Sequence, residues 1–196
     1  MSSPNYTAKI EYFGIKNLNI GLSGYFGKSQ SRLFNKLHTD SARLQTIADS
    51  SVIGISMIGA DLRYKTKGIE LRGQFYHTRF TNTEQYNLLT AVNGTPNDLG
   101  SSMIGYYAEI GYNVLRPFEN IKSELLPFVR YEYYNTHKTV MDGMQKNQAY
   151  ENTIITTGLT YRINKNAAFK TDLQFIKPAN GSKYTKTFDA GIAVMF

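Results

Sequence analysis

The chain has 196 residues, a net charge of +7, 15 tyrosines, 11 phenylalanines, and neither cysteine nor tryptophan. Its length suits one domain, and a hydrophobic content of 41% excludes a disordered polar chain. No uncharged apolar run approaches the roughly 18–20 residues of a spanning helix, which excludes a helical membrane protein. The lack of cysteine excludes disulfides and thiolate metal sites. We expect neither a cofactor nor a bound metal.

Alternation with a period of two is the dominant pattern along the chain. From Leu18 to Phe26 every second residue belongs to an apolar face, while polar or small residues occupy the positions between. Such alternation indicates a strand with one apolar face. The same pattern predicts nine strands, near residues 7–13, 18–26, 52–64, 69–79, 103–114, 125–136, 152–163, 168–177 and 187–196.

The predicted connections alternate in length. Short connections are expected at 14–17, 65–68, 115–124 and 164–167, long ones at 27–51, 80–102 and 137–151, and one of intermediate length at 178–186. This alternation of connection lengths is typical of an antiparallel barrel with short turns on one side of a membrane and longer loops on the other. Within the connection 27–51, apolar residues between Leu33 and Ile47 leave two alternatives open, a folded outer loop or a segment that narrows a pore.

A soluble barrel buries its apolar face, whereas a membrane barrel turns that face to lipid and its polar face to a wet lumen. Aromatic residues near the strand ends of the apolar face, such as Tyr106 and Tyr112, favour the membrane case. The fold class we predict is an all-β, antiparallel transmembrane β-barrel built as a meander. A soluble carrier of the lipocalin type would leave the sorted loops unexplained.

The charged residues of the predicted polar face are the candidate pore lining. They are mixed in sign, and the basic excess is expected mainly in loops and turns, for example at Lys28, Lys65 and Lys186. This loop charge suggests a preference for anions. The candidate pore-lining residues are Lys9, Glu11, Asp61, Arg63, Glu70, Arg72, Glu109, Arg130, Glu132, Arg162, Lys170, Asp172 and Asp189.

The last strand ends in a pattern that resembles the assembly signal of bacterial outer-membrane barrels. Its elements are a polar residue, a glycine two positions later, and apolar residues at the third-last and last positions. Here these are Asp189, Gly191, Val194 and Phe196. The resemblance implies that the last strand is recognised by the barrel-assembly machinery and that the protein lies in the bacterial outer membrane.

Four further segments resemble the C-terminal half of the phosphate-selective porin family, porins O and P. They are Gly105–Tyr112, Leu126–Glu132, Thr157–Arg162 and Lys170–Gln174. The resemblance implies a barrel of 16–18 strands, outer-membrane lipid and small hydrophilic solutes as partners, and a homotrimer. It assigns no phosphate-binding residue.

Strand parity bears on the extent of the barrel. Single-chain outer-membrane barrels of bacteria have even strand numbers, whereas the alternation pattern predicts nine strands, an odd number. The N-terminal residues also show no basic and then apolar signal sequence. We therefore expect residues 1–196 to form either a single β-barrel domain with one strand miscounted or, as we favour, the C-terminal portion of a longer porin.

The leading functional hypothesis is a porin for passive diffusion of small solutes or ions, including anions such as phosphate. We do not expect the protein to be an enzyme. The alternatives are a small closed outer-membrane barrel acting as an adhesin or anchor, or a hydrolase active at its rim. For the hydrolase, His38, His77 and His137 fall in or near outer loops, but no motif pairs them with a nucleophile. We expect them to be surface histidines. The basic residues are scattered, which argues against nucleic-acid binding.

Overall fold

A computed structural model describes residues 4–29 and 52–195 of the chain. The described residues form one antiparallel sheet of nine strands, and each strand pairs with the next in sequence. The strands are β1 (Tyr6–Tyr12), β2 (Leu18–Ser29), β3 (Ile53–Thr66), β4 (Ile69–Thr81), β5 (Ser102–Tyr112), β6 (Glu124–Thr139), β7 (Glu151–Arg162), β8 (Ala167–Pro178) and β9 (Thr185–Val194).

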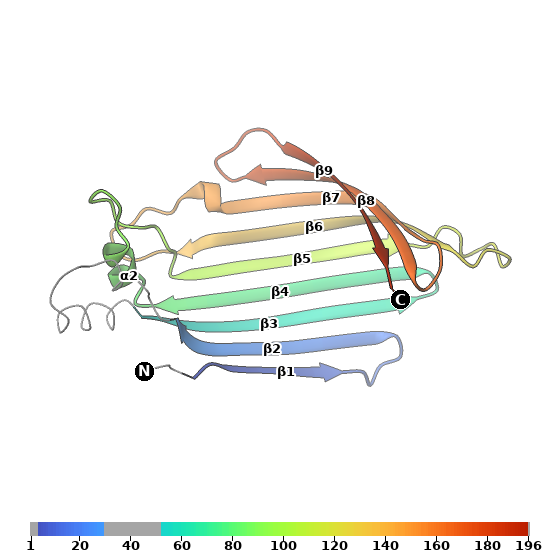
Figure 1. Cartoon of the computed structure of the whole chain (residues 1–196), viewed down its shortest axis with the longest axis horizontal. Helices are drawn as coiled ribbons and strands as arrows, with labels where there is room; N and C mark the ends of the chain where they lie inside the picture. The colour runs from blue at the N-terminus through green and yellow to red at the C-terminus, as the bar shows by residue number, and fades with distance from the viewer. Residues whose placement is uncertain (1–3, 30–51, 196) are drawn as a thin grey trace.

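The sheet is a single layer that does not close on itself (Figure 1). β1 and β9 are its two edges, and β8 and β9 run obliquely across the direction of the other strands in this view. The prediction of nine antiparallel strands in a meander is therefore confirmed, whereas the described residues themselves form an open sheet and not a closed barrel. No helix within residues 4–29 and 52–195 has the length and apolarity needed to cross a membrane.

Turn chemistry explains the short connections. Between β3 and β4 the chain reverses over Lys67 and Gly68, whose φ angles are 45° and 84°. Two successive positive φ angles define the type I′ turn, which matches the twist of the flanking strands. The predicted turn at 65–68 is thus shorter than expected, because Lys65 and Thr66 continue the ladder opposite Glu70 and Ile69.

The longer connections join the strands at the opposite end of the sheet. The segment between β4 and β5 contains the helix α2 (Thr83–Leu89), and the segment before β7 contains the 3₁₀ helix η2 (Gln148–Tyr150). Neither helix was expected from the alternation pattern. The segment between Leu33 and Ile47 lies outside the described residues.

The two faces of the sheet differ in chemistry as predicted, and their exposure is the reverse of that in a soluble sheet. On the apolar face the exposed fraction is 74% for Ile10, 52% for Ile110 and 67% for Phe188. On the opposite face Glu70 and Asp172 are each only 8% exposed. Within the described residues the buried apolar side chains also lie on this polar face: Ile53, Leu126, Phe128 and Ile154.

The tight-turn border of the apolar face is marked by tyrosines on alternate strands. Tyr12 of β1 is level with Leu62 of β3, and Tyr64 lies two residues nearer the turns. Tyr64 is in turn level with Ile110 of β5, and Tyr112 lies two residues further on. Tyr161 continues the series on β7. The border therefore crosses the strands obliquely.

The border near the long loops is marked by charges. Among the strand positions of the apolar face that the structure describes, charged side chains occur only at this end, and all but one are basic. The cross-strand pairs from β9 back to β2 place Lys186 level with Ile20. Lys28 lies on β2 eight residues from Ile20, toward the long loops, so the border shifts by eight residues between β2 and β9. This border is therefore oblique in the same direction. The charged residues are Lys28, Arg79, Glu151, Lys177 and Lys186.

Close approach of neighbouring strands on the polar face leads to a prediction about Gly158. A Cβ atom there would meet the carbonyl oxygen of Thr171 and would lie 2.6 Å from Cβ of Asp172 and 2.8 Å from Cε1 of Phe128. We expect Gly158→Ala to lower the free energy of unfolding by about 1–3 kcal/mol, because overpacking forces the backbone to shift. Urea unfolding followed by circular dichroism measures the change.

Gly105→Ala is the matched control on the same face. A Cβ at Gly105 would lie 3.6 Å from Cβ of Tyr134, an ordinary contact. Its free energy of unfolding should change by less than that of Gly158→Ala. Equal losses in the two variants would contradict a specific close approach at Gly158.

Candidate functional site

Charges on the polar face of the sheet form the candidate site. The cross-strand register places all thirteen predicted pore-lining residues on this one face. Two further charges belong with them, Lys65 at the end of β3 and Glu124 at the start of β6. Both follow the same alternation, two residues from Arg63 and Leu126, but the predicted strand 52–64 ended one residue before Lys65 and the predicted strand 125–136 began one residue after Glu124.

Glu70 is the centre of an ion-pair network near the tight turns. Its carboxylate accepts hydrogen bonds from the guanidinium of Arg162 at 2.7 and 3.0 Å and lies 2.8 Å from Nζ of Lys65. Arg72 donates to the same carboxylate at 3.2 Å. Arg162 also donates to Glu124 at 2.5 Å. This side of the polar face therefore holds three cations around two carboxylates.

The Glu70–Arg162 contact shows that the polar face is concave. Glu70 lies on β4 and Arg162 on β7, and β5 and β6 lie between them. Three strand spacings of a flat sheet are about 14 Å. Two side chains that stand roughly perpendicular to a flat sheet would not meet over that distance. The sheet therefore curves around its charged face.

The network continues across the middle strands. Arg72 lies 3.6 Å from Glu109, and the same carboxylate accepts two hydrogen bonds from Arg130 at 2.8 and 3.0 Å. The guanidinium of Arg130 also lies 4.5 Å from the ring centroid of Tyr107, on the same face, and 3.9 Å from Glu132. Charges of opposite sign thus alternate along the face from β3 to β7.

A second cluster lies near the β1 edge. Nζ of Lys9 is 3.0 Å from Glu11 and 3.4 Å from Asp61 of β3. Gly21 of β2 lies between β1 and β3 at this level, and a Cβ there would collide with the Asp61 carboxylate. The absence of a side chain at Gly21 therefore allows the pair to form across β2.

The remaining predicted charges are distributed over β3, β8 and β9. Lys170 lies 3.3 Å from Asp172 and 4.7 Å from the ring centroid of Phe128. Asp189 accepts a hydrogen bond from Gln174 at 3.1 Å. Arg63 lies directly opposite Arg72 and, within the described residues, makes no ion pair.

The predicted assembly residues lie on β9. Asp189, Gly191 and Val194 belong to this edge strand, whose residues are all exposed. Phe196 lies outside the described residues. Recognition of this strand by assembly machinery stays a prediction. An exposed edge strand does present unpaired backbone groups to a partner strand.

The described histidines, which were expected in or near outer loops, lie in strands and differ from one another in environment. His137 is 3% exposed, so the expectation of a surface residue is wrong for it. Its Nδ1 accepts a hydrogen bond from the Asn147 amide at 3.2 Å, so Nε2 carries the proton and donates to the carbonyl of Asp98. His77 lies on the apolar face of β4. His38 lies outside the described residues.

His137 joins two of the loops. The hydroxyl of Tyr150 donates to the Asp98 carboxylate at 2.9 Å, and this hydrogen bond raises the pKa of Tyr150. The rings of His137 and Tyr150 lie 4.4 Å apart. Asn87 of α2 is fully buried and bonds both backbone groups of Leu99. These contacts hold the β4–β5 and β6–β7 connections together. Both ring nitrogens of His137 are occupied by hydrogen bonds to backbone groups of these connections.

Comparison with known proteins adds little on function. No protein-family model matches the chain. A protein of Aquifex aeolicus (strain VF5), described as uncharacterized, is 26% identical over 172 residues. The match covers 85% of this chain and 36% of that protein, so the chain spans about a third of the length of the relative it matches. Among the described residues no group of histidine, aspartate and glutamate is arranged to hold a metal ion.

Arg162→Gln tests the contribution of the network to stability. The substitution leaves the carboxylates of Glu70 and Glu124 with Lys65 and Arg72 as their remaining cationic partners. Hydrogen bonds to charged groups contribute about 1.5–3 kcal/mol each when buried, and partial exposure lowers that value. We expect a loss of about 1–2 kcal/mol in the free energy of unfolding, measured with urea.

Arg63→Gln is the matched control, because it removes the same charge from the same face without breaking an ion pair within the described residues. Its free energy of unfolding should stay the same or rise, since like charges opposite each other destabilise a strand pair. A larger loss for Arg63→Gln than for Arg162→Gln would contradict the network as a stabilising element.

Proposed function

We propose that this chain forms part of a transmembrane β-barrel in the bacterial outer membrane, a porin through which small hydrophilic solutes or ions diffuse passively. The observation that carries the proposal is the apolar face with its two parallel, oblique borders. The proposal assigns this face to lipid and the concave, charged face to a water-filled lumen.

The slope of the borders supports the proposal quantitatively. The tyrosines from Tyr12 to Tyr161 shift by six residues over six strand spacings, which is about 20 Å along the strands for about 29 Å across them. The slope is about 35°. The basic border, from Lys28 to Lys186, slopes by about 38° on the same measure. Strands of transmembrane barrels tilt by about 35–45° from the barrel axis.

The height of the apolar band also fits a membrane. On β2 the band runs from Leu18 to Lys28, and on β8 from Phe169 to Lys177. These lengths correspond to about 33 and 26 Å along the strands. At a tilt of about 36° they become about 27 and 21 Å, close to the apolar band of about 25 Å in outer-membrane barrels. A row of tyrosines at one border corresponds to an aromatic girdle.

The pairing of the charges bears on selectivity. The thirteen predicted charges together with Lys65 and Glu124 comprise seven basic and eight acidic side chains, and most of them lie in ion pairs. Paired charges of opposite sign produce a weak net field in a lumen. Lys28, Lys65 and Lys186 lie in strands and not in loops, so the loop charge is smaller than expected. A preference for anions such as phosphate stays a prediction, as do the homotrimer and the lack of an enzymatic activity.

Cysteine labelling tests which face meets water, because the chain contains no cysteine of its own. Gln74 and Phe75 are neighbours on β4 and lie on opposite faces. In membranes, a water-soluble thiosulfonate should react with Gln74→Cys far faster than with Phe75→Cys. In a protein surrounded by water Phe75→Cys would react readily, since Phe75 is 37% exposed. Equal rates in membranes would overturn the proposal.

Conductance of the complete protein in a planar lipid bilayer tests the channel itself. We expect stepwise increases in current and, under a salt gradient, a small reversal potential. Reaction of Gln74→Cys with a bulky thiosulfonate should reduce the current, and the same reagent should leave Phe75→Cys unchanged. Membrane insertion without any current would favour the adhesin or anchor alternative over a porin.

A further inference from the structure

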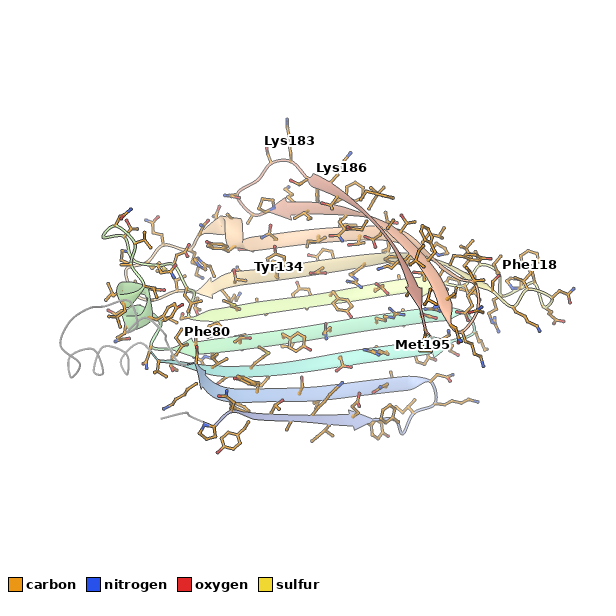
Figure 2. The ribbon with its side chains drawn as sticks, viewed as in Figure 1. Phe80, Phe118, Tyr134, Lys183, Lys186 and Met195 are labelled. Atoms are coloured by element: carbon orange, nitrogen blue, oxygen red, sulfur yellow. The ribbon has the colours of Figure 1, made fainter. Side chains whose placement is uncertain are left out.

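Basic residues gather on one side of the β8–β9 hairpin, at the long-loop border of the apolar face. Lys177 ends β8 on this face, Lys186 begins β9 on the same face, and Lys183 and Tyr184 lie in the connection between them. Figure 2 shows Lys183 and Lys186 projecting from this hairpin at the edge of the sheet. Three positive charges thus lie within ten residues of sequence on one hairpin.

The three lysines make no ion pair within the described residues. Nζ of Lys177 lies 5.7 Å from the ring centroid of Tyr184, and Nζ of Lys186 lies 5.9 Å from that of Phe175. Each ammonium group therefore lies near an aromatic ring, Lys177 near one in the connection and Lys186 near one on the apolar face. The acidic residue of this border, Glu151, is already bonded to Tyr133 and Asn135 at 2.9 and 3.0 Å.

The position of the charges restricts their partner. If the apolar face meets lipid, as proposed above, this border lies at the headgroup level of one leaflet. Lysine side chains at that level extend their ammonium groups toward the membrane surface, where the available anions are lipid phosphates. At the tight-turn border the apolar strand positions have tyrosines and no charge within the described residues. The two borders therefore differ at the strand positions of the apolar face, while the tight turns have lysines of their own at Lys16, Lys67 and Lys165.

We propose that Lys177, Lys183 and Lys186 form a binding site for the phosphate group of a membrane lipid in the leaflet that faces the long loops. The ammonium groups would bind the phosphate oxygens as charge-assisted hydrogen-bond donors. Tyr184 and Phe175 would contact the adjoining apolar part of the lipid. The inference rests on the proposed function, since it requires the apolar face to lie in a bilayer.

Quenching by brominated lipids tests the site. The chain has no tryptophan, and Phe188→Trp places a reporter on the apolar face, two residues from Lys186. The protein is reconstituted into phosphatidylcholine vesicles that contain brominated phosphatidic acid or, in a parallel sample, brominated phosphatidylcholine. Emission of the protein without the reporter is subtracted. We expect brominated phosphatidic acid to quench at least about fivefold more effectively, the effect of even one lysine at an anionic surface.

Two triple variants carry the same loss of charge at opposite ends of the sheet. Lys177→Gln, Lys183→Gln and Lys186→Gln together should bring the two quenching efficiencies to equality. Lys16→Gln, Lys67→Gln and Lys165→Gln, which lie in the tight turns, should leave the preference unchanged. Equal quenching in the parent protein, or the same loss in both triple variants, would overturn the lipid site.

Failure of the proposed function would give a different result. If brominated phosphatidylcholine also failed to quench the reporter, the apolar face would not lie in the bilayer, and the porin proposal itself would fall. Quenching by both lipids without preference would leave the membrane assignment standing and remove the phosphate site alone.

Discussion

The structure depends on the ion pairs that neutralise the charged side chains on the concave face of a single-layer sheet. Glu70 of β4 pairs with three cations, including a guanidinium from three strands away. Glu109 of β5 pairs with two, one each from β4 and β6. These contacts draw the charged side chains together and leave the apolar side chains on the convex surface. The charged side chains therefore pair on the concave face, and the apolar side chains lie on the convex face, exposed to the surrounding medium.

Water is a poor medium for that convex face. Hydrophobic burial is the main favourable contribution to folding in soluble domains, yet large apolar side chains of this face, such as Ile10, Ile110 and Ile192, are exposed. Contiguous apolar patches much larger than a few hundred Å² mark binding or membrane surfaces. Here the patch covers nearly every strand and ends at two oblique borders. The geometry of those borders argues for a lipid layer more directly than the hydrophobicity does.

Much of this arrangement could be predicted from the sequence. Alternation alone predicts which face each residue occupies, so all thirteen candidate charges share one face, and nine strands were expected. The partners could not be predicted in the same way, because Arg162 reaches Glu70 only through curvature that depends on register. Lys65 and Glu124 were missed because the ends of strands have weak local signals. His137 was missed as a buried residue because its partners come from loops that alternation does not describe.

Strand direction adds one further constraint on how such a sheet could become a barrel. In an antiparallel meander of nine strands the first and the last run in the same direction, so β1 and β9 could pair with each other only as parallel strands. A wholly antiparallel barrel that contains this sheet therefore needs an odd number of strands between β9 and β1. The exposed edges of β1 and β9 would then be paired with those strands, and the oblique borders of the apolar face would continue around the barrel.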